Sequence, residues 1–501
     1  MKRGISSYLA FDLGAESGRS IVGRFDGSRL GLKEIHRFQN GGVRVGQSLH
    51  WDVLRLWQEI RDGLRLAGTQ CGDGLKSVAV DTWGVDFGLL ASDDTLIANP
   101  HHYRDRRTDG MLQRAFERIS PGEIYERTGI QLMQINSLFQ LLSMVDAGSP
   151  EISIAASFLN MPDLFNFFLS GHKASEFTIS TTTQCYDPRA SGWSVDLLSK
   201  LGIPRHIFGN VIQPGQSLGR LRPALADDVE LRSLTVVAGA GHDTACAVAA
   251  VPASETEHIY ISSGTWSLMG VEIDKPIISA ESLSAGLTNE GGVGKKFTFL
   301  KNINGLWPVQ ECRRLWALEG DAYGYDDLTR LASGAPPFTC LVVPDDARFL
   351  APANMPETIA AFCRETGQAA PGDRGAILRC VLEGLALEYR RVAELLESLV
   401  GKYLPVIHVV GGGSRNELLN QFTADATGRI VIAGPAEATA IGNILIQCLA
   451  AGDIGSLAEG RAIVRNSFEL RSYIPTRPEA WSEAYAHYLQ IRSSRLQEGR
   501  P

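Results

Sequence analysis

The chain has 501 residues, and its composition of 44% hydrophobic and 21% charged residues is typical of a globular protein with two large domains or more. Its 48 Lys and Arg residues are outnumbered by 56 Asp and Glu residues, which gives a net charge of −8. This acidic balance argues against a protein that binds nucleic acid or an anionic membrane through its overall charge.

The amino terminus and the cysteines favour a cytoplasmic enzyme. The opening MKRGISSYLAFDLG starts with basic residues, but its apolar stretch is short and contains Asp12, so we do not expect a signal peptide. No apolar run reaches the length of a transmembrane helix. The eight cysteines are scattered without a CxxC pair, so we expect reduced thiols rather than structural zinc or a disulfide framework.

The first part of the chain predicts an α/β lobe. Residues 8–12, 20–25 and 30–38 alternate like strands, and the short turns between them predict an antiparallel meander. A helix then follows Asp52, which is a good N-cap, because apolar residues recur at helical spacing after it. A buried strand over residues 77–80 completes this pattern.

A second start lies about halfway along the chain. Residues 258–262 and 267–272 predict two strands around a small polar turn, and Gly264 then corresponds to Gly14 of the first hairpin. We interpret this match as an internal duplication. The alternative is that two hairpins with Gly and Ser turns resemble each other by chance.

The second half also predicts alternating helices and strands. Its expected helices are residues 376–399, 416–427 and 437–450, and its expected strands are residues 406–410 and 430–432. We therefore expect a first lobe at residues 1–248, a second at 249–475, and a helix and tail at 476–501.

Two hairpin turns and a glycine loop could hold phosphate. In the stretch 12–19, DLGAESGR, an acid at a strand end lies beside exposed backbone N–H groups, which suits Mg²⁺ and phosphate oxygens. The turn at 262–265, SSGT, offers hydroxyls and N–H groups without an acid. Three glycines at 411–413 permit close approach of a ligand to the backbone. Each stretch is also typical of an ordinary turn.

The stretch GAGHDTACA at 239–247 offers a candidate general base. Gly239 and Gly241 precede His242 and Asp243, which lie at the start of an expected helix. Asp243 could be a simple helix cap. Alternatively, the helix dipole keeps it ionised, and it accepts a proton from an attacking hydroxyl.

Two loops could bind a polyol. DTWGVDF at 81–87 offers two carboxylates and an aromatic ring after a buried strand. YRDRRT at 103–108 adds dense charge, although it could equally be a solvated salt-bridge patch.

Together these motifs resemble those of the FGGY carbohydrate kinases, and within them the branch that phosphorylates L-rhamnulose. The resemblance extends to about residue 475 and includes TWGVDF at 82–87, SSGTWSLMG at 262–270 and LKNINGLW at 300–307. It implies an α/β fold of two actin-like (ribonuclease-H-like) lobes with a catalytic cleft between them. It also implies ATP, Mg²⁺ and phosphoryl transfer to the 1-hydroxyl of L-rhamnulose in L-rhamnose catabolism.

The resemblance also implies roles for individual residues. Asp243 is the catalytic base, and Asp12 supports Mg²⁺, mainly through water. The sugar-binding residues are Gly84, Asp86, Arg104, His242, Asp243 and Thr244. The ATP-binding residues are Ala15, Glu16, Ser17, Gly18, Arg19, Thr265, Asn302, Gln310, Gly412 and Gly413.

This chain departs from the wider family at two places. Glu16 stands where many relatives have serine, and its carboxylate should repel phosphate unless it points away or meets the metal or Arg19. The stretch 440–443, AIGN, lacks a common Ala-Ala ending. Two other functions remain open: a kinase for another ketose such as L-fuculose, and an actin-like ATP-switch scaffold. The expected partners are a small sugar and ATP, with the chain a monomer or homodimer.

Overall fold

The computed structural model describes residues 5–498, so the residues 1–4 of the expected basic start and 499–501 of the expected tail lie outside it. The chain forms two compact units, and each unit contains three separate segments of the sequence. Unit 1 contains Met1–Ser254, Glu272–Phe299 and Ala438–Ser467, and unit 2 contains Glu255–Val271, Leu300–Glu437 and Phe468–Pro501.

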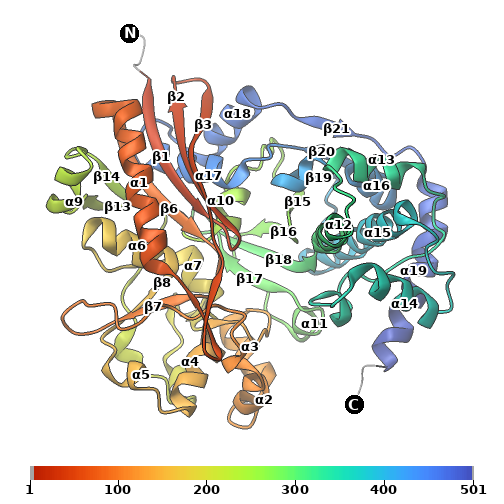
Figure 1. Cartoon of the computed structure of the whole chain (residues 1–501), viewed down its shortest axis with the longest axis horizontal. Coiled ribbons are helices and arrows are strands. Elements are labelled where there is room, and N and C mark those ends of the chain that lie inside the picture. Colours follow the sequence, from red (N-terminus) through yellow and green to blue (C-terminus); the bar gives the residue numbers. More distant parts are fainter. Residues whose placement is uncertain (1–4, 499–501) are drawn as a thin grey trace. The chain divides into compact units, whose positions relative to one another are not determined.

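Unit 1 is built on a sheet with the strand order β13-β14-β6-β1-β2-β3 (Figure 1). These strands are β1 (Ser6–Leu13), β2 (Ser17–Phe25), β3 (Leu30–Gln39), β6 (Leu75–Thr82), β13 (Gln216–Arg220) and β14 (Thr235–Ala238). β1, β2 and β3 pair antiparallel, as the meander predicted, and β6 runs parallel to β1. The carboxyl ends of β1 and β6 therefore lie side by side.

Four helices support this sheet. α1 (Val53–Cys71) begins after Asp52, whose side chain accepts a hydrogen bond from Arg55 N, and the predicted N-cap is confirmed. α1 and α6 (Met161–Ser170) share one apolar core with Leu9, Phe11 and other residues of β1 and β6. α17 (Ala438–Ala450) contacts β1, β2 and β6, and it also packs against α10 (Asp243–Ala249).

The remaining elements of unit 1 are mostly short helices and strands, which sequence patterns did not predict. Its helices are α2 (Met111–Phe116), α3 (Pro121–Thr128), α4 (Ser137–Asp146), α5 (Pro150–Ile154), α7 (Phe177–Thr182), α8 (Val195–Lys200), α9 (Pro223–Asp228), α11 (Ala280–Ser284), α18 (Leu457–Ser467), η1 (Gly72–Gly74), η2 (Arg106–Thr108) and η3 (Arg205–Ile207). Its strands are β4 (Gly42–Val45), β5 (Ser48–Trp51), β7 (Phe87–Leu90), β8 (Ser157–Asn160), β9 (Ser175–Glu176), β10 (Tyr186–Asp187), β11 (Gly192–Trp193), β12 (Val211–Ile212) and β17 (Thr288–Gly291).

Unit 2 is built on strands of the second sheet, whose order is β17-β18-β16-β15-β19-β20-β21. The division between the units passes through β16 and β18, so β17 and the adjoining ends of these two strands are counted with unit 1. The strands are β15 (His258–Ser263), β16 (Trp266–Ile273), β18 (Phe297–Asn304), β19 (Val406–Val410), β20 (Ile430–Ala433) and β21 (Arg471–Tyr473). The helices of unit 2 are α12 (Trp307–Leu318), α13 (Tyr325–Gly334), α14 (Met355–Glu365), α15 (Arg374–Val400), α16 (Glu417–Thr427), α19 (Pro478–Glu498), η4 (Ala347–Phe349) and η5 (Gly412–Arg415).

The two sheets share an arrangement of five strands. β1 pairs antiparallel with β2 and parallel with β6, as β15 does with β16 and β19. A further parallel strand lies beyond, with β14 next to β6 and β20 next to β19. An antiparallel strand then pairs with it in each sheet, although β13 precedes β14 in the chain whereas β21 follows β20, and the second sheet has one strand more. This shared order supports the predicted duplication much more strongly than two similar turns did.

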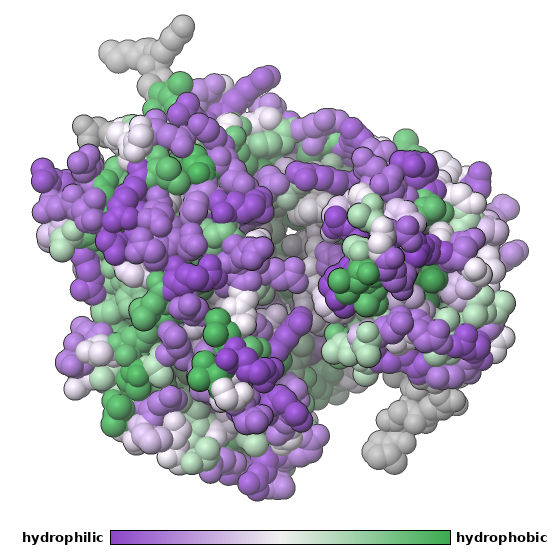
Figure 2. All heavy atoms as spheres, in the orientation of Figure 1, coloured by the Kyte–Doolittle hydropathy of each residue, from purple (hydrophilic) through white to green (hydrophobic). Residues whose placement is uncertain are grey.

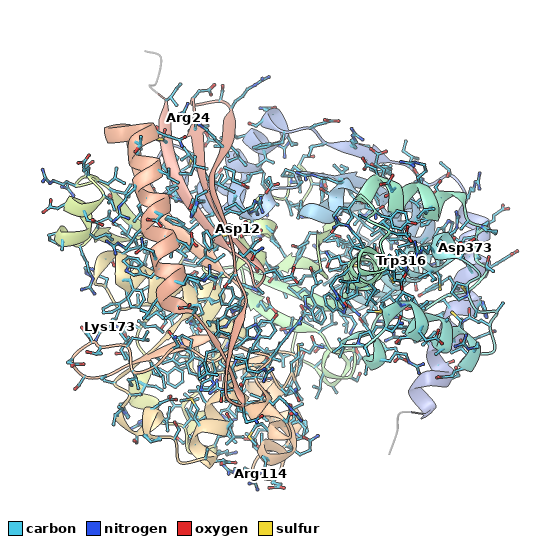
Figure 3. All side chains as sticks on the ribbon, in the orientation of Figure 1. Asp12, Arg24, Arg114, Lys173, Trp316 and Asp373 are labelled. Carbon is cyan, nitrogen blue, oxygen red and sulfur yellow. The ribbon has the colours of Figure 1, made fainter. Side chains whose placement is uncertain are left out.

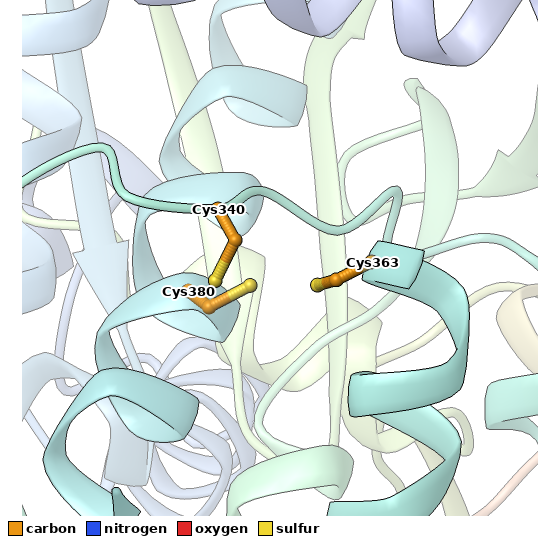
Figure 4. Close-up of side chains that lie close together, drawn as sticks. All are labelled: Cys340, Cys363 and Cys380. Atoms are coloured by element: carbon orange, nitrogen blue, oxygen red, sulfur yellow. The ribbon is translucent and has the colours of Figure 1, made fainter. Parts of the chain in front are cut away.

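Three cysteines that are far apart in the sequence come together in unit 2. Cys340, Cys363 of α14 and Cys380 of α15 are buried, and their sulfur atoms lie within 4.8 Å of one another (Figure 4). All eight cysteines have free thiols. Spacing along the chain could not indicate this cluster, because the three residues belong to three different segments.

Hydrophilic side chains cover most of the visible face of each unit, and hydrophobic atoms form only small scattered groups there (Figure 2). Among the residues that the structure describes, no helix combines the length and the apolar character that crossing a membrane requires.

Candidate active site

Asp12 lies near the carboxyl end of β1 (Figure 3), and the hairpin to β2 places it opposite Arg19. The two side chains form an ion pair, and only 9% of the Asp12 side chain is exposed. Glu16 is exposed in the same turn and forms no ion pair within residues 5–498. Arg19 therefore neutralises the predicted metal carboxylate, Asp12, rather than the additional carboxylate of Glu16. Ala15 lies in this turn, in which Gly14 N donates to Ser17 O, and Ser17 and Gly18 begin β2.

Asp81 is a second acid at this edge of the sheet. It is the register partner of Asp12 on β6, and it is completely buried. Its Oδ2 accepts a hydrogen bond of 2.6 Å from Asn443 Nδ2 of α17, whereas its Oδ1 has no hydrogen-bond partner among the described residues. Burial and the charge of Asp12 raise the pKa of Asp81 well above its usual range. The sequence indicated Asp81 only as one of two carboxylates of a polyol-binding loop, although its place at a strand end matches that of Asp12.

Asp243 is the first residue of α10. The preceding loop is fixed to β6 because Thr82 N donates to Gly241 O at 2.9 Å. Asp243 Oδ1 accepts hydrogen bonds from Thr244 N at 2.6 Å and Thr244 Oγ1 at 3.2 Å, while 34% of the side chain stays exposed. Burial of the carboxyl group and the negative charge of Asp12 raise the pKa of Asp243 to about 7. Burial and Asp12 therefore oppose the ionised form that the dipole of this helix of 7 residues was expected to favour.

A buried glutamate that sequence reasoning missed holds this loop. Glu176 Oε2 accepts a hydrogen bond of 2.9 Å from Gly241 N, and further bonds come from Thr178 and Ile179 at the start of α7. Burial raises the pKa of Glu176 to about 7. No local pattern around Glu176 indicates this role, because its partner is 65 residues away in the chain.

His242 lies between two carboxyls and close to Gly84. Its Nε2 is 3.4 Å from Asp243 Oδ1, and its Nδ1 is 3.4 Å from Glu290 Oε2 of β17. A Cβ atom at Gly84 would lie 3.5 Å from His242 Nε2, and 3.3 Å from Thr182 Oγ1. The structure thus brings together four of the six predicted sugar-binding residues: Gly84, His242, Asp243 and Thr244.

The other two predicted sugar-binding residues have different surroundings. Asp86 is completely buried, and its carboxylate accepts four hydrogen bonds, from Trp51 Nε1, Trp83 Nε1, Tyr103 N and Gln140 Nε2. These donors make Asp86 the anchor of the loop that carries Gly84. Arg104 is exposed, and its guanidinium lies 5.5 Å from the centre of the Tyr103 ring.

The predicted ATP-binding residues of unit 2 form a second group. Thr265, in the turn between β15 and β16, donates from Oγ1 to Gln310 Oε1 of α12 at 3.0 Å. The glycine loop packs against the same hairpin, since a Cβ at Gly413 would meet Ser263 Oγ at 2.0 Å. Gly412 instead faces open space, with nothing within 4 Å of a Cβ at its position. Asn302 lies on β18, two residues before the strand ends.

The two groups are suited to different parts of one reaction. Unit 1 offers a carboxyl with a pKa near neutrality beside a histidine, and further carboxyl oxygens of the kind that a hard divalent cation binds. Unit 2 offers a small polar turn and an open glycine loop, which allow a flat ligand or phosphate to approach the backbone.

Family models match both halves of the chain. The N-terminal domain of the FGGY family of carbohydrate kinases matches residues 7–250, and the C-terminal domain of that family matches residues 259–451.

Similar proteins have closely comparable lengths. A rhamnulokinase of Bacteroides thetaiotaomicron is 44% identical over 482 residues, which cover 96% of this chain and 98% of the relative. A rhamnulokinase of Oceanobacillus iheyensis is 42% identical over 93% of this chain and 97% of its own. A rhamnulokinase of Pectobacterium carotovorum is 37% identical over 99% of this chain and 98% of its own.

Solved structures share the fold at low sequence identity. A xylulose kinase of Lactobacillus acidophilus superposes with a TM-score of 0.81 at 16% identity, covering 98% of each chain. The glycerol kinase of Plasmodium falciparum, solved with ADP, has a TM-score of 0.78 at 15% identity, again covering 98% of each chain. These likenesses confirm the predicted two-lobed, actin-like α/β fold.

Proposed function

The chain belongs to the FGGY family of carbohydrate kinases, and we propose that it transfers the γ-phosphoryl group of ATP to the 1-hydroxyl of L-rhamnulose. The products are L-rhamnulose 1-phosphate and ADP. The observation that carries the chemistry is Asp243, whose pKa of about 7 suits a base that works near neutral pH. The sugar follows from relatives named rhamnulokinase that match nearly the whole chain at 37–44% identity.

Asp243 has one oxygen available for proton transfer. Thr244 donates two hydrogen bonds to Oδ1, and His242 Nε2 also faces that oxygen. Oδ2 therefore accepts the proton of the sugar 1-hydroxyl while the hydroxyl oxygen attacks the γ-phosphorus. The bond from this phosphorus to the β–γ bridging oxygen breaks, and ADP leaves with that oxygen.

Gly84 and His242 bind the sugar beside this base. Gly84 presents no side chain toward His242 Nε2, so the backbone of this loop leaves that nitrogen uncovered for a hydroxyl group of the ketose. Asp86 acts indirectly in this proposal, because its four donors use its carboxylate to hold the Gly84 loop. Arg104, which is exposed, contacts the outer end of the sugar.

The residues around Asp12 fit a magnesium ion. Their donors are carboxyl oxygens, which Mg²⁺ prefers, and Asp81 Oδ1 is a buried oxygen without a hydrogen-bond partner among the described residues. Asp12 would hold the ion mainly through water, since Arg19 already occupies part of its carboxylate. When bound, Mg²⁺ supplies positive charge for the phosphate oxygens. Arg19 and the N–H groups of residues 15–18 contact the phosphates, and Thr265, Asn302, Gln310, Gly412 and Gly413 contact the nucleotide.

A panel of ketoses tests the choice of substrate. Purified protein is incubated with ATP, Mg²⁺ and each of L-rhamnulose, L-fuculose, L-ribulose and D-xylulose, and ADP release is followed by a coupled assay. We expect the highest kcat/KM for L-rhamnulose, with the phosphate on O1 by NMR. A higher value for another ketose would reassign the substrate. ATP hydrolysis that no sugar stimulates would favour the ATP-switch alternative.

A further inference from the structure

Glu290 is a buried carboxyl that faces the candidate sugar site of unit 1. It belongs to the stretch TNEGG on β17, and only 7% of the residue is exposed. Its Oε2 has no hydrogen-bond partner among the described residues, and His242 Nδ1 lies 3.4 Å from this oxygen. A buried carboxylate oxygen without a hydrogen-bond donor lowers the stability of the fold. A small movement of His242 that brings Nδ1 within hydrogen-bond distance of Glu290 Oε2 is therefore favourable.

His242 is fixed so that its two ring nitrogens face different groups. Its backbone N donates to Thr178 Oγ1 at 3.2 Å, and only 10% of its side chain is exposed. Nδ1 faces Glu290, whereas Nε2 faces Asp243 and the space beside Gly84. Burial lowers the pKa of His242, so the ring is neutral near pH 7 and carries one N–H and one lone pair.

We propose that Glu290 is a positioning residue that accepts a hydrogen bond from His242 Nδ1–H and thereby makes Nε2 an acceptor for a hydroxyl group of the ketose. Each ring nitrogen lies 3.4 Å from a carboxyl oxygen, so either tautomer leaves one lone pair facing a carboxyl group. The other tautomer is disfavoured because Asp243 Oδ1 already accepts two hydrogen bonds from Thr244, whereas Glu290 Oε2 has no donor among the described residues. It would also donate Nε2–H to Asp243 Oδ1, which would stabilise the charged carboxylate and weaken it as a base. The identification of the ligand as a ketose rests on the proposed function, whereas the tautomer of His242 does not.

Nuclear magnetic resonance of protein labelled with ¹⁵N-histidine tests the tautomer directly. The His242 signals are assigned by their loss in His242→Gln. We expect the Nδ1–H form in the wild-type protein near neutral pH. In Glu290→Gln we expect a mixture of both tautomers, because an amide can either accept from Nδ1–H or donate to Nδ1. Glu281→Gln is the matched control, since Glu281 is exposed in the same segment of the chain.

Kinetics give the second readout. We expect Glu290→Gln to raise the KM for the ketose by about tenfold, the effect of weakening one hydrogen bond to a charged group, while the KM for ATP stays within about twofold. Glu281→Gln should change neither constant. An Nε2–H tautomer or an imidazolium in the wild-type protein would overturn the proposal. So would a Glu290→Gln protein with the wild-type tautomer and KM.

Misfolding of Glu290→Gln and a failure of the proposed function can each be distinguished from these outcomes. Circular dichroism shows whether Glu290→Gln folds, and if it does not, the wild-type tautomer still decides the proposal. If no ketose is phosphorylated, the proposed function fails, while the tautomer measurement continues to test the role of Glu290.

Discussion

At the scale of single residues, the roles of Asp243 rest on its free oxygen and its raised pKa. Replacing it by Asn keeps the shape of the side chain but removes the proton acceptor. We expect Asp243→Asn to lower kcat by about 10²–10⁴-fold, which is the usual contribution of a general base. ADP affinity, measured by calorimetry, should change by less than about threefold. Asp227→Asn, an exposed change in unit 1, is the control. An Asp243→Asn enzyme with near-normal turnover would contradict the assignment.

The pH dependence of kcat/KM follows from the same carboxyl. Asp243 must be deprotonated to act as a base, and its pKa is about 7, so activity should fall as the pH drops below about 7. The charge of Asp12 contributes to raising this pKa. Asp12→Asn removes that charge, so the acid limb of the profile should move to lower pH even if the maximum rate falls. An acid limb that stays in place, or moves to higher pH, would show that Asp12 does not influence the base.

Residues in contiguous motifs could be predicted from the sequence, whereas residues that support them could not. Asp12, Gly84 and Asp243 stand in recognisable stretches, and the structure places Gly84 and Asp243 around one histidine. Glu176 and Glu290 act through partners that are 65 and 48 residues away along the chain, so no local pattern reveals them. Asp81 is the intermediate case, because its strand end was predicted but its proximity to Asp12 depends on the pairing of β1 with β6.

At the scale of elements, the contact between α10 and α17 fixes the start of the helix that carries Asp243. A Cβ at Gly442 would lie 1.8 Å from the backbone oxygen of Cys246, so the two helices touch where only glycine fits. The adjacent Asn443 holds Asp81, and Gln447 one turn later accepts from Ser77 Oγ. The AIGN stretch therefore has a structural and electrostatic role that its sequence alone did not reveal.

Gly442→Ala should force α10 and α17 apart. Overpacking of this kind costs about 1–3 kcal/mol, and the displacement of α10 should also lower kcat. Gly122→Ala is the matched control, because Gly122 lies in α3 of the same unit with nothing within 4 Å of a Cβ. Urea denaturation and steady-state kinetics of both variants measure the effects. Equal stability of the two variants would mean that the helices move apart without cost.

At the scale of the whole molecule, the duplication could be predicted but the exchange of segments between the units could not. The two matching turns indicated repeated lobes, and the shared pairing of the central strands in both sheets is consistent with that prediction. Residues 272–299 and 438–467 nevertheless return to unit 1, where they supply Glu290 and Asn443. Hydrophobic periodicity predicts that these segments form helices and strands, but it carries no information about which core they join. The domain boundaries expected at residues 248 and 475 remain predictions.

This division of the chain predicts that each substrate protects a different set of segments from hydrogen exchange. L-Rhamnulose alone should slow exchange around residues 82–87 and 241–245, and also around residues 288–291, because Glu290 contacts the same site from a distant segment. ADP with Mg²⁺ should slow exchange in unit 2 around residues 263–267 and 411–416, where Gly413 packs on Ser263. Mass spectrometry of exchanged peptides separates these sets, and peptides of α19 (Pro478–Glu498), which carries no proposed ligand contact, provide an internal control. Protection of residues 411–416 by the sugar alone would contradict this assignment of substrates to units. Protection of 82–87 and 241–245 without 288–291 would separate Glu290 from the sugar site while leaving the base loop in place.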